Sequence, residues 1–478
     1  MSWTARAGRF LNFFWKSGTT GVKGINETAA QDAVEAAISS AKVSHQELEQ
    51  AKKAAVSSRP HSTPKADGRR DPLHAKFQIT GDDGRPLTSA HYYPSPLGGK
   101  QVWFSKPKYN DGKQVNEYFP EDTGEDEDAR VGETISKRKG HKPSNRYVAL
   151  KITNCGKEER KSAYEEAEIS RHISRVRSSH EGRAYVRLVE ESFEIQGSLG
   201  NHVCLVFEPL REPLWALGRH LGNVGVPLAV LKPFLKLFFE GLDFLHSECH
   251  VIHTDLKADN FLVGFEDSTV LESYVRQQED DPAPFKVSDG RPIFQSRPDF
   301  GPLKKGVGLA RISDFSAAVF GNVSIPHNHD IQPLPFCAPE VLLKATWTYS
   351  TDIWNVGTML WELLADDSLF DGRDPRDNSY SREAHMGQMI RLLGPPPLRL
   401  LERADEHVCS QLFSSQGQFK FPHLIPSENF DLSNRTPFLH GEDKRLFLEF
   451  ARKMLQWEPE QRPTAKELEN DPWLNFKA

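Results

Sequence analysis

One stretch in the second half of the chain restricts the fold more than any other. Residues 251–263 consist of a short apolar run, a polar turn and a second apolar run. Such apolar runs are typical of two buried strands. Asp255, Lys257 and Asn260 occupy the turn between them. A surface turn that joins two buried strands would explain the same letters, so the rest of the chain must show whether these polar residues have a chemical role.

Composition narrows the class of protein. The 478 residues are 38% hydrophobic, which is enough for a large core and more than one domain. A formal net charge of −6 argues against general nucleic-acid binding and fits a basic partner. The five cysteines are scattered without a C-x-x-C pair, so we expect neither structural zinc nor a disulfide framework. No apolar run reaches the length of a membrane span, so we expect a soluble intracellular protein.

The turn in residues 251–263 resembles the catalytic loop of protein kinases, whose pattern is H-R-D-L-K-x-x-N. Here Thr254 stands where the family usually has Arg. The resemblance implies that Asp255 accepts the proton of an attacking hydroxyl and that Lys257 reaches the transferred phosphate. It also implies that Asn260 holds Mg²⁺, which neutralises the developing charge. Lys257 further favours a serine/threonine kinase, because tyrosine kinases usually carry other residues there.

A second motif follows the same family order. Residues 311–316 resemble the D-F-G segment, which implies that Asp314 binds Mg²⁺ and that Phe315 packs on His253. Ser316 replaces the glycine of that motif. A Cβ penalises by about 1 kcal/mol some backbone conformations that glycine adopts freely. The replacement therefore affects the backbone, but it removes no magnesium ligand.

The resemblance also implies roles that support the loop. Glu340 is expected to form a buried ion pair with Arg462, and Asp352 is expected to hydrogen-bond the catalytic-loop backbone. Kinases with Arg in place of Thr254 use it to bind a phosphate on the activation loop. Threonine carries no charge, so we expect activity that does not require this phosphorylation.

The phosphate-binding side of the site is expected on a strand and a helix. The strand that carries Lys151 resembles the V-A-I-K strand, whose lysine contacts the α- and β-phosphates. A helix is predicted over residues 158–176. Glu168 on that helix is our candidate for the carboxylate that pairs with Lys151. Spacing alone leaves Glu165 and Glu166 as alternatives.

The base-binding side follows from chain order. Phe207 ends a buried strand and precedes the predicted hinge, in which Glu208 and Leu210 would bind adenine through their backbone. The Gly-rich turn that covers the phosphates in kinases is degenerate here. Gly132 is the candidate remnant of its first glycine, and the second and third glycines are not at the expected positions.

We therefore predict an α+β protein with the bilobal protein-kinase fold, comprising a small β-rich N-lobe, a larger helical C-lobe and an extra N-terminal region. The predicted segments are a tail and linker at 1–72 with one helix near 27–55, short strands of unknown role at 73–120, the N-lobe at 121–209, and the C-lobe at 210–478 with an insert at 264–308. Residues 1–26 are basic, aromatic and free of acids. A mitochondrial presequence is thus an alternative to a plain amphipathic segment.

Several later motifs narrow the resemblance to the SR-protein-specific kinases, particularly the fungal ones: residues 253–255, 330–333, 347–357, 392–397 and 453–459. This resemblance implies ATP and Mg²⁺ as cofactors and Arg-Ser-rich proteins of the mRNA-splicing machinery as substrates. It also implies a monomer of the cytoplasm and nucleus that binds neither nucleic acid nor membrane itself. A basic substrate needs carboxylates on the enzyme, and the candidates, each equally explained as a solvated surface group, are Asp366, Asp367, Asp371, Asp374 and Asp377.

Two departures keep a second class of protein open. The degenerate Gly-rich turn and Ser316 would suit a pseudokinase that binds protein partners without turnover. An active enzyme is favoured because the residues expected to do the chemistry are all present, namely Lys151, Asp255, Asn260 and Asp314.

Overall fold

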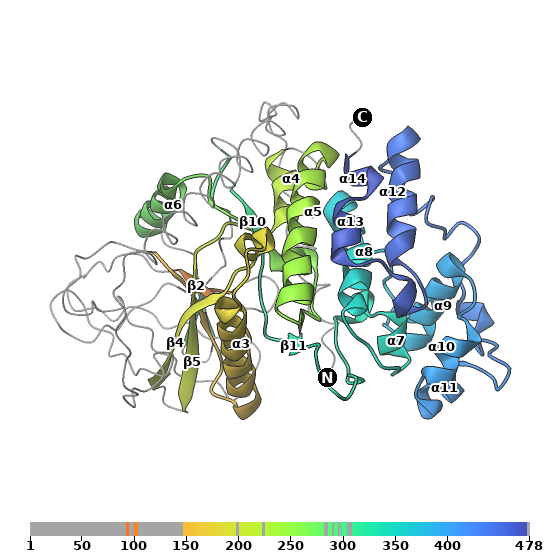
Figure 1. The fold of residues 1–478 in the computed structure, drawn as a ribbon. Coiled ribbons are helices and arrows are strands. Elements are labelled where there is room, and N and C mark those ends of the chain that lie inside the picture. Colours follow the sequence, from red (N-terminus) through yellow and green to blue (C-terminus); the bar gives the residue numbers. More distant parts are fainter. Residues whose placement is uncertain are drawn as a thin grey trace.

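The computed structural model describes residues 147–196, 200–221, 225–281, 297, 299–303 and 308–475, together with four short strands outside these ranges. Those strands are β1 (Tyr92–Pro94), β2 (Lys100–Trp103), β8 (Phe285–Ser288) and β9 (Arg291–Phe294). The predicted helix near 27–55 and the candidate Gly132 lie outside the described residues. Figure 1 shows a β-rich part beside α3 and a larger helical part that ends at α14. This is the predicted bilobal α+β arrangement.

The small lobe is built on one antiparallel sheet with the order β1-β2-β3-β5-β4. Its longer strands are β3 (Ala149–Ile152), β4 (Val189–Gln196) and β5 (Asn201–Phe207). Residues 92–103 thus add two strands to this sheet, because β2 pairs with β3. The boundary that we predicted at residue 121 excludes them and is wrong for the sheet.

Helix α3 (Lys157–Arg175) packs on the small-lobe sheet and closely matches the helix predicted over 158–176. Its buried side carries Ala163, Glu166, Ala167 and Ser170, which are spaced three or four residues apart. At about 100° per residue, these positions share one face of the helix. Glu166 is the only charged residue of these four. It lies between the lobes, where it contacts Lys151.

The large lobe is a bundle of helices around two long central ones. They are α5 (Leu228–Asp243), continued by a π turn at Phe244–Glu248, and α8 (Ser350–Ala365). The other helices are α4 (Leu217–His220), α7 (Pro339–Leu342), α9 (Arg382–Leu393), α10 (Leu398–Arg403), α11 (Glu406–Leu412), α12 (Gly441–Met454), α13 (Ala465–Glu469) and α14 (Pro472–Asn475). Short 3-10 turns lie at Glu181–Tyr185, Leu214–Ala216, Ala258–Asn260, Leu334–Phe336, Pro422–Leu424 and Pro459–Gln461.

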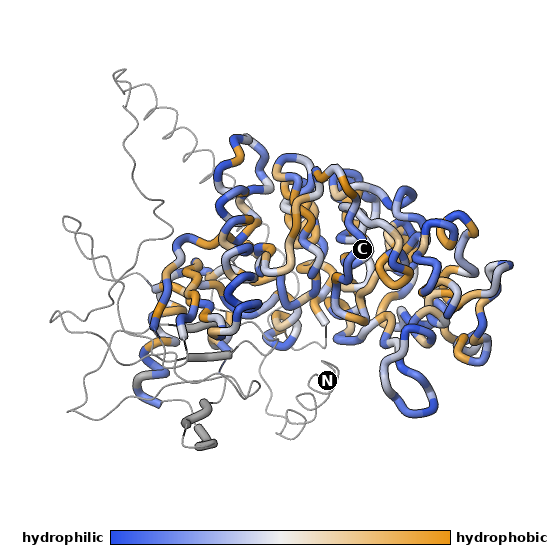
Figure 2. The backbone as a smooth tube through the Cα atoms, turned by 90° about the horizontal axis from the view of Figure 1, so that it is seen from below, coloured by the Kyte–Doolittle hydropathy of each residue, from blue (hydrophilic) through white to orange (hydrophobic). Residues whose placement is uncertain are grey.

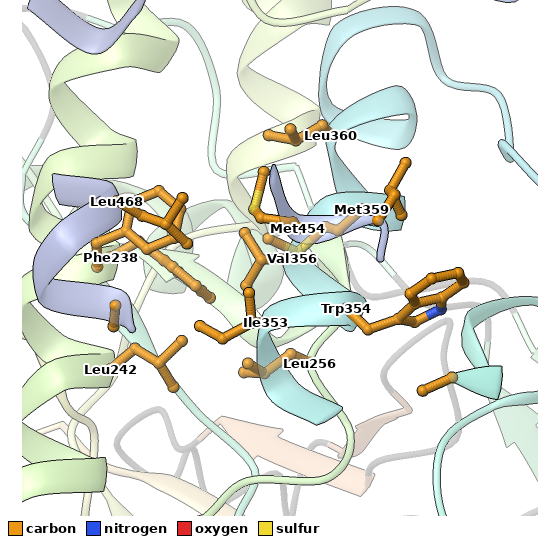
Figure 3. Packing of buried hydrophobic residues seen from close by; sticks show 14 of the residues in the cluster. Phe238, Leu242, Leu256, Ile353, Trp354, Val356, Met359, Leu360, Met454 and Leu468 are labelled. Atoms are coloured by element: carbon orange, nitrogen blue, oxygen red, sulfur yellow. The ribbon is translucent and has the colours of Figure 1, made fainter. Parts of the chain in front are cut away.

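Helix α8 is apolar on nearly every side because other elements surround it. Figure 3 shows Ile353, Val356 and Met359 of this helix among side chains from neighbouring segments, including Leu256 of the catalytic loop. In Figure 2 the hydrophobic segments lie mostly inside the large lobe and the hydrophilic ones at its margin. The catalytic loop therefore rests on a packed helix, which restricts its motion. Among the described residues, no helix is both long and apolar enough to cross a membrane.

Two short ladders bracket the catalytic loop. Strand β6 (Val251–Ile252) pairs with β11 (Val319–Phe320), and β7 (Phe261–Val263) pairs with β10 (Ala310–Ile312), both antiparallel. The two buried strands that the sequence predicts around the polar turn are thus confirmed. The turn lies between them, and each strand pairs with a segment that follows the insert.

The predicted insert at 264–308 contains α6 (Ser268–Asp280) as well as the β8–β9 hairpin. The apolar side of α6, with Val270, Leu271 and Tyr274, shares a buried cluster with Leu205 and Phe207 of β5. The insert is also tied to the chain just after the predicted hinge. Arg211 Nη1 donates to both Glu266 oxygens at 2.8 Å, and its Nη2 donates to the Gly301 carbonyl at 2.6 Å.

Candidate active site

One buried carboxylate on α8 binds the backbone of the catalytic loop. Asp352, in the first turn of α8, accepts the backbone N–H of His253 and that of Thr254, both at 2.8 Å. It also bonds His246 Nε2 at 2.9 Å. The predicted role of Asp352 is confirmed. Thr254 has a left-handed backbone with φ of 65°, and its hydroxyl donates to the Ala317 carbonyl at 2.7 Å. A hydroxyl here joins the loop to the segment after Asp314.

Asp255 contacts two other polar side chains of the loop. Lys257 Nζ lies 2.8 Å from Asp255 Oδ2. Asn260 Nδ2 donates to the Asp255 carbonyl at 2.8 Å and to its carboxylate at 3.2 Å. Burial disfavours the charged form of Lys257, but the carboxylates of Asp255, Asp314 and Asp259 together outweigh it and raise the pKa of Lys257. The lysine is therefore cationic at neutral pH and can neutralise a phosphate next to the proton acceptor.

The β7–β10 ladder brings Asn260 and Asp314 together although they are far apart in the sequence. Phe261 pairs with Ile312, and the next step of the ladder is a hydrogen bond from Ser313 N to the Asn260 carbonyl at 2.8 Å. Asp314 follows immediately with φ of 68°. Strained backbone of this kind clusters at functional sites. The two predicted magnesium ligands therefore lie at the same end of one ladder.

The segment around Asp314 also packs on the catalytic loop. The rings of His253 and Phe315 have centroids 5.0 Å apart, and His253 Nε2 bonds the Ser313 carbonyl at 3.1 Å. The predicted contact between Phe315 and His253 is confirmed.

Lys151 joins the two lobes through two carboxylates. Its Nζ lies 2.8 Å from Glu166 Oε2 and 2.7 Å from Asp314 Oδ1. Burial alone would lower the pKa of Lys151, but these two carboxylates raise it above its usual value. Burial likewise opposes ionisation of Asp314, yet the charge and hydrogen bond of Lys151 hold its pKa below the usual range. Asp314 is therefore an anion at neutral pH.

Our choice of Glu168 as the partner of Lys151 is wrong. The Glu168 side chain is 60% exposed and pairs with Arg171 on its own helix. Position 168 lies about 200° around α3 from position 166 and therefore faces away from Lys151. The small residues Ala163, Ala167 and Ser170 mark the side of α3 that meets the sheet, and this signal in the sequence would have selected Glu166.

The donor set fits a magnesium ion. Mg²⁺ prefers oxygen ligands, one or two of them carboxylates, with phosphate and water completing the shell. Asp314 offers an ionised carboxylate. Asn260 commits its amide nitrogen to Asp255, so its amide oxygen is the group available as a ligand.

The predicted hinge begins where β5 ends. Phe207 is buried at the end of β5, and Glu208 and Leu210 follow it directly. The Glu208 carboxylate pairs with Arg311. Leu210 is buried as well.

Sequence reasoning missed two acids beside the catalytic loop. Asp259 accepts the indole N–H of Trp215 at 2.9 Å, and Glu362 of α8 accepts the backbone N–H of Ala258. Burial, with the charge of Asp259 next in importance, raises the pKa of Glu362 to about 8. Burial raises the pKa of Asp259 to about 6. For Glu362 the signal in the sequence was a lone acid near the end of an apolar helix, because acids among apolar residues are usually paired.

The predicted buried ion pair between Glu340 and Arg462 is also confirmed. Arg462 donates through Nη1 and Nη2 to the two Glu340 oxygens at 2.6 and 2.7 Å, and both side chains are fully buried. Helix α8 continues this support, because Asn355 Nδ2 donates to the Phe336 carbonyl at 2.8 Å. One helix thus holds both the catalytic loop and the segment before Glu340.

Comparisons with known proteins agree with this geometry. The family described as "protein kinase domain" matches residues 132–474. A serine/threonine protein kinase of Aspergillus fumigatus is 38% identical over 333 residues, which cover 69% of this chain and 78% of that protein. A serine/threonine-protein kinase SRPK of Physarum polycephalum is 29% identical, covering 70% of this chain and 80% of that protein. A crystal structure of a kinase domain matches with a TM-score of 0.51 at 23% identity, covering 70% of this chain and 89% of that one, and it supports the fold.

The chain belongs to the protein kinase family. Within it, the protein is a serine/threonine protein kinase. The family implies ATP and a divalent metal for the reaction, and a protein as the substrate.

Proposed function

We propose that this kinase transfers the γ-phosphoryl group of ATP to serine or threonine in Arg-rich protein segments such as Arg-Ser repeats. The observation that carries the substrate class is a group of carboxylates beside the catalytic loop. Asp259 belongs to the loop itself, and Glu362 and Asp366 lie at the end of α8. The charges of Asp259 and Asp366 both raise the pKa of Glu362, and the charge of Asp366 also raises that of Asp259.

The nearby cations Lys257 and Arg219 favour ionisation of these carboxylates, but burial outweighs them. Burial raises the pKa of Asp366 above its usual value, as it does for Asp259 and Glu362. When ionised, the three carboxylates repel one another, and a guanidinium placed among them would relieve this repulsion and donate hydrogen bonds from its planar fork. A basic side chain near the acceptor serine would therefore position that serine close to Asp255.

The five acids that the sequence suggested for binding a basic substrate differ in their partners. Asp367 pairs with Arg435, Asp371 accepts Gln388 Nε2, Asp374 pairs with Arg376, and Asp377 accepts the backbone N–H and hydroxyl of Ser379. These four have local partners. Asp366 alone among the five influences the loop acids, so we assign the basic substrate to Asp259, Glu362 and Asp366.

The chemistry follows from the residues around Asp255. Asp255 accepts the proton of the substrate hydroxyl, while Lys257 and Lys151 neutralise phosphate oxygens. Asn260 and Asp314 would hold magnesium, which supplies further charge neutralisation when it is bound. Glu166 keeps the Lys151 ammonium in place.

The name of the Physarum relative supports the same substrate class. We accordingly propose a role in mRNA splicing, a monomeric state, and residence in the cytoplasm and nucleus, without direct binding of nucleic acid.

Peptide phosphorylation across a pH series tests the proposal. An Arg-Ser repeat peptide is compared with a peptide in which citrulline, a neutral analogue, replaces each Arg. The wild type should prefer the Arg peptide. That preference should grow from pH 6 to pH 9, because Asp259 and then Glu362 lose protons, with pKa values of about 6 and about 8, and become anions.

Glu362→Gln should flatten the upper part of the pH profile and reduce the preference by about tenfold, which corresponds to ~1.4 kcal/mol. The matched control is Asp374→Asn, which removes an acid already neutralised by Arg376 and should change nothing. Equal rates on the two peptides at every pH would contradict the proposed substrate class.

A further inference from the structure

A buried arginine lies where the two lobes meet, behind the predicted hinge. Arg187 lies two residues before β4 and is 2% exposed. Its backbone N–H donates to the Ile312 carbonyl at 2.8 Å. Its guanidinium lies 4.8 Å from the ring centroid of Phe207, and Nη1 reaches Ser313 Oγ at 3.4 Å. The group therefore contacts both the residue before the hinge and the residue before Asp314.

The same guanidinium binds the backbone oxygen of the hinge. Arg187 Nε and Nη2 donate to the Glu208 carbonyl at 3.0 and 2.6 Å. A carbonyl oxygen has two lone pairs, and two N–H groups of one fork use both of them. The Glu208 oxygen is thus already satisfied by the protein.

This arginine remains charged. Burial lowers the pKa of Arg187 to about 9, and the neighbouring Arg311 acts in the same direction. The group is still protonated at neutral pH. The Glu208 oxygen therefore has a positive charge beside it, which disfavours the approach of a further N–H donor.

Adenine offers two groups along the edge that a hinge contacts. The exocyclic amine at C6 donates a hydrogen bond, and the ring nitrogen N1 accepts one. In the predicted hinge, the Glu208 carbonyl is the acceptor suited to the amine, and the Leu210 N–H is the donor suited to N1. Arg187 already donates to the Glu208 carbonyl, so the Leu210 N–H is the group that remains for the base.

We propose that Arg187 sets the base specificity of the nucleotide site, so that the adenine amine contributes little and the ring nitrogen N1 is the group that is recognised. This inference rests on the proposed function, because it takes the hinge as the base-binding segment. The site then tolerates purine nucleotides that lack the amine. It still rejects guanine, whose N1 carries a hydrogen and would meet the Leu210 N–H.

Calorimetric titration of the full-length protein with nucleotides in the presence of Mg²⁺ tests this directly. The probes are ATP, purine riboside triphosphate, which lacks only the amine, and GTP. We expect the Kd of purine riboside triphosphate to lie within about threefold of that of ATP, since one net hydrogen bond is worth roughly two- to tenfold in affinity. GTP should bind at least about tenfold more weakly.

Arg187→Met frees the Glu208 oxygen. In this variant ATP should bind about tenfold more tightly than purine riboside triphosphate. Arg171→Met is the control, because Arg171 is also largely buried but pairs with Glu168 on the outer side of α3. Its nucleotide preference should equal that of the wild type.

A wild type that binds ATP more than about tenfold more tightly than purine riboside triphosphate would overturn the inference, whether or not Arg187→Met folds. An unchanged ratio in a folded Arg187→Met variant would overturn it as well. If none of the three nucleotides binds, both the proposed function and this inference fail, whereas a strong preference for ATP leaves the proposed function intact.

Discussion

The catalytic-loop side of the site and its base-binding side are built in different ways. On the catalytic side, Asp255, Lys257 and Asn260 lie within six residues of one another, and a single buried acid, Asp352, holds their backbone. On the predicted base side, the Glu208 oxygen of the hinge accepts hydrogen bonds from Arg187, which lies two residues before β4. The comparison teaches that the residues assigned to the reaction chemistry are encoded locally, whereas the proposed base recognition depends on long-range packing.

The largest effect should follow from removing the proton acceptor. Asp255→Asn keeps the shape of the side chain but cannot accept the proton, so kcat should fall by roughly 10²–10⁴-fold. The Kd for ATP should stay close to that of the wild type, because the base side is untouched. Steady-state kinetics and calorimetry measure the two quantities. Asp377→Asn, on an exposed loop, is the control, and a parallel loss of ATP binding in Asp255→Asn would show that the two sides are not separate.

The support beneath the catalytic side should be nearly as sensitive. Arg462→Ala leaves Glu340 buried without its partner, which should lower the free energy of unfolding by about 3–5 kcal/mol. Denaturant titration measures this change. The control is Arg445→Ala, because Arg445 is an exposed residue that pairs with Glu442 and Glu449 along α12, and its variant should unfold close to wild type. Similar midpoints for the two variants would contradict the assigned role of the buried pair.

A smaller effect should separate the two glutamates of α3. Glu166→Gln removes a charged partner of Lys151, so kcat/KM should fall about 10- to 100-fold, since hydrogen bonds to charged groups are worth ~1.5–3 kcal/mol. Glu168→Gln should retain the rate of the wild type. A larger loss in Glu168→Gln than in Glu166→Gln would restore the assignment that the sequence suggested.

No change at all is expected from removing phosphate from the activation loop. Thr254 is uncharged and already binds the Ala317 carbonyl through its hydroxyl, so the loop needs no phosphate to hold it. Rates on a peptide substrate before and after phosphatase treatment test this expectation. Stronger activity that is lost on treatment and regained on rephosphorylation would contradict it.

Much of the catalytic side could be predicted from the sequence, because its residues have short, fixed spacings. Asp255, Lys257 and Asn260 share one turn, and Asp314 follows a recognisable strand. The structure brings these residues together and confirms the roles of Asp352 and of the Glu340–Arg462 pair.

The rest depends on tertiary packing, which the identity of a single residue does not reveal. The partner of Lys151 depends on which face of α3 meets the sheet, and the candidates Glu165, Glu166 and Glu168 differ there only by rotation about the helix axis. Arginine is usually exposed, so Arg187 in an otherwise apolar run gave no sign of its burial. The pairing of β2 with β3 likewise joins segments almost fifty residues apart, which no local pattern predicts.

The central claim is that Asn260 and Asp314, brought together by the β7–β10 ladder, act on one magnesium–nucleotide site. A double-mutant cycle of Asn260→Ala and Asp314→Ala measures how strongly Mg²⁺ tightens ATP binding in each variant. Each single variant should abolish most of the tightening, and the double variant should lose no more than the worse single one, because both residues serve the same ion. Two partial losses that multiply in the double variant would show two independent sites and would contradict this account.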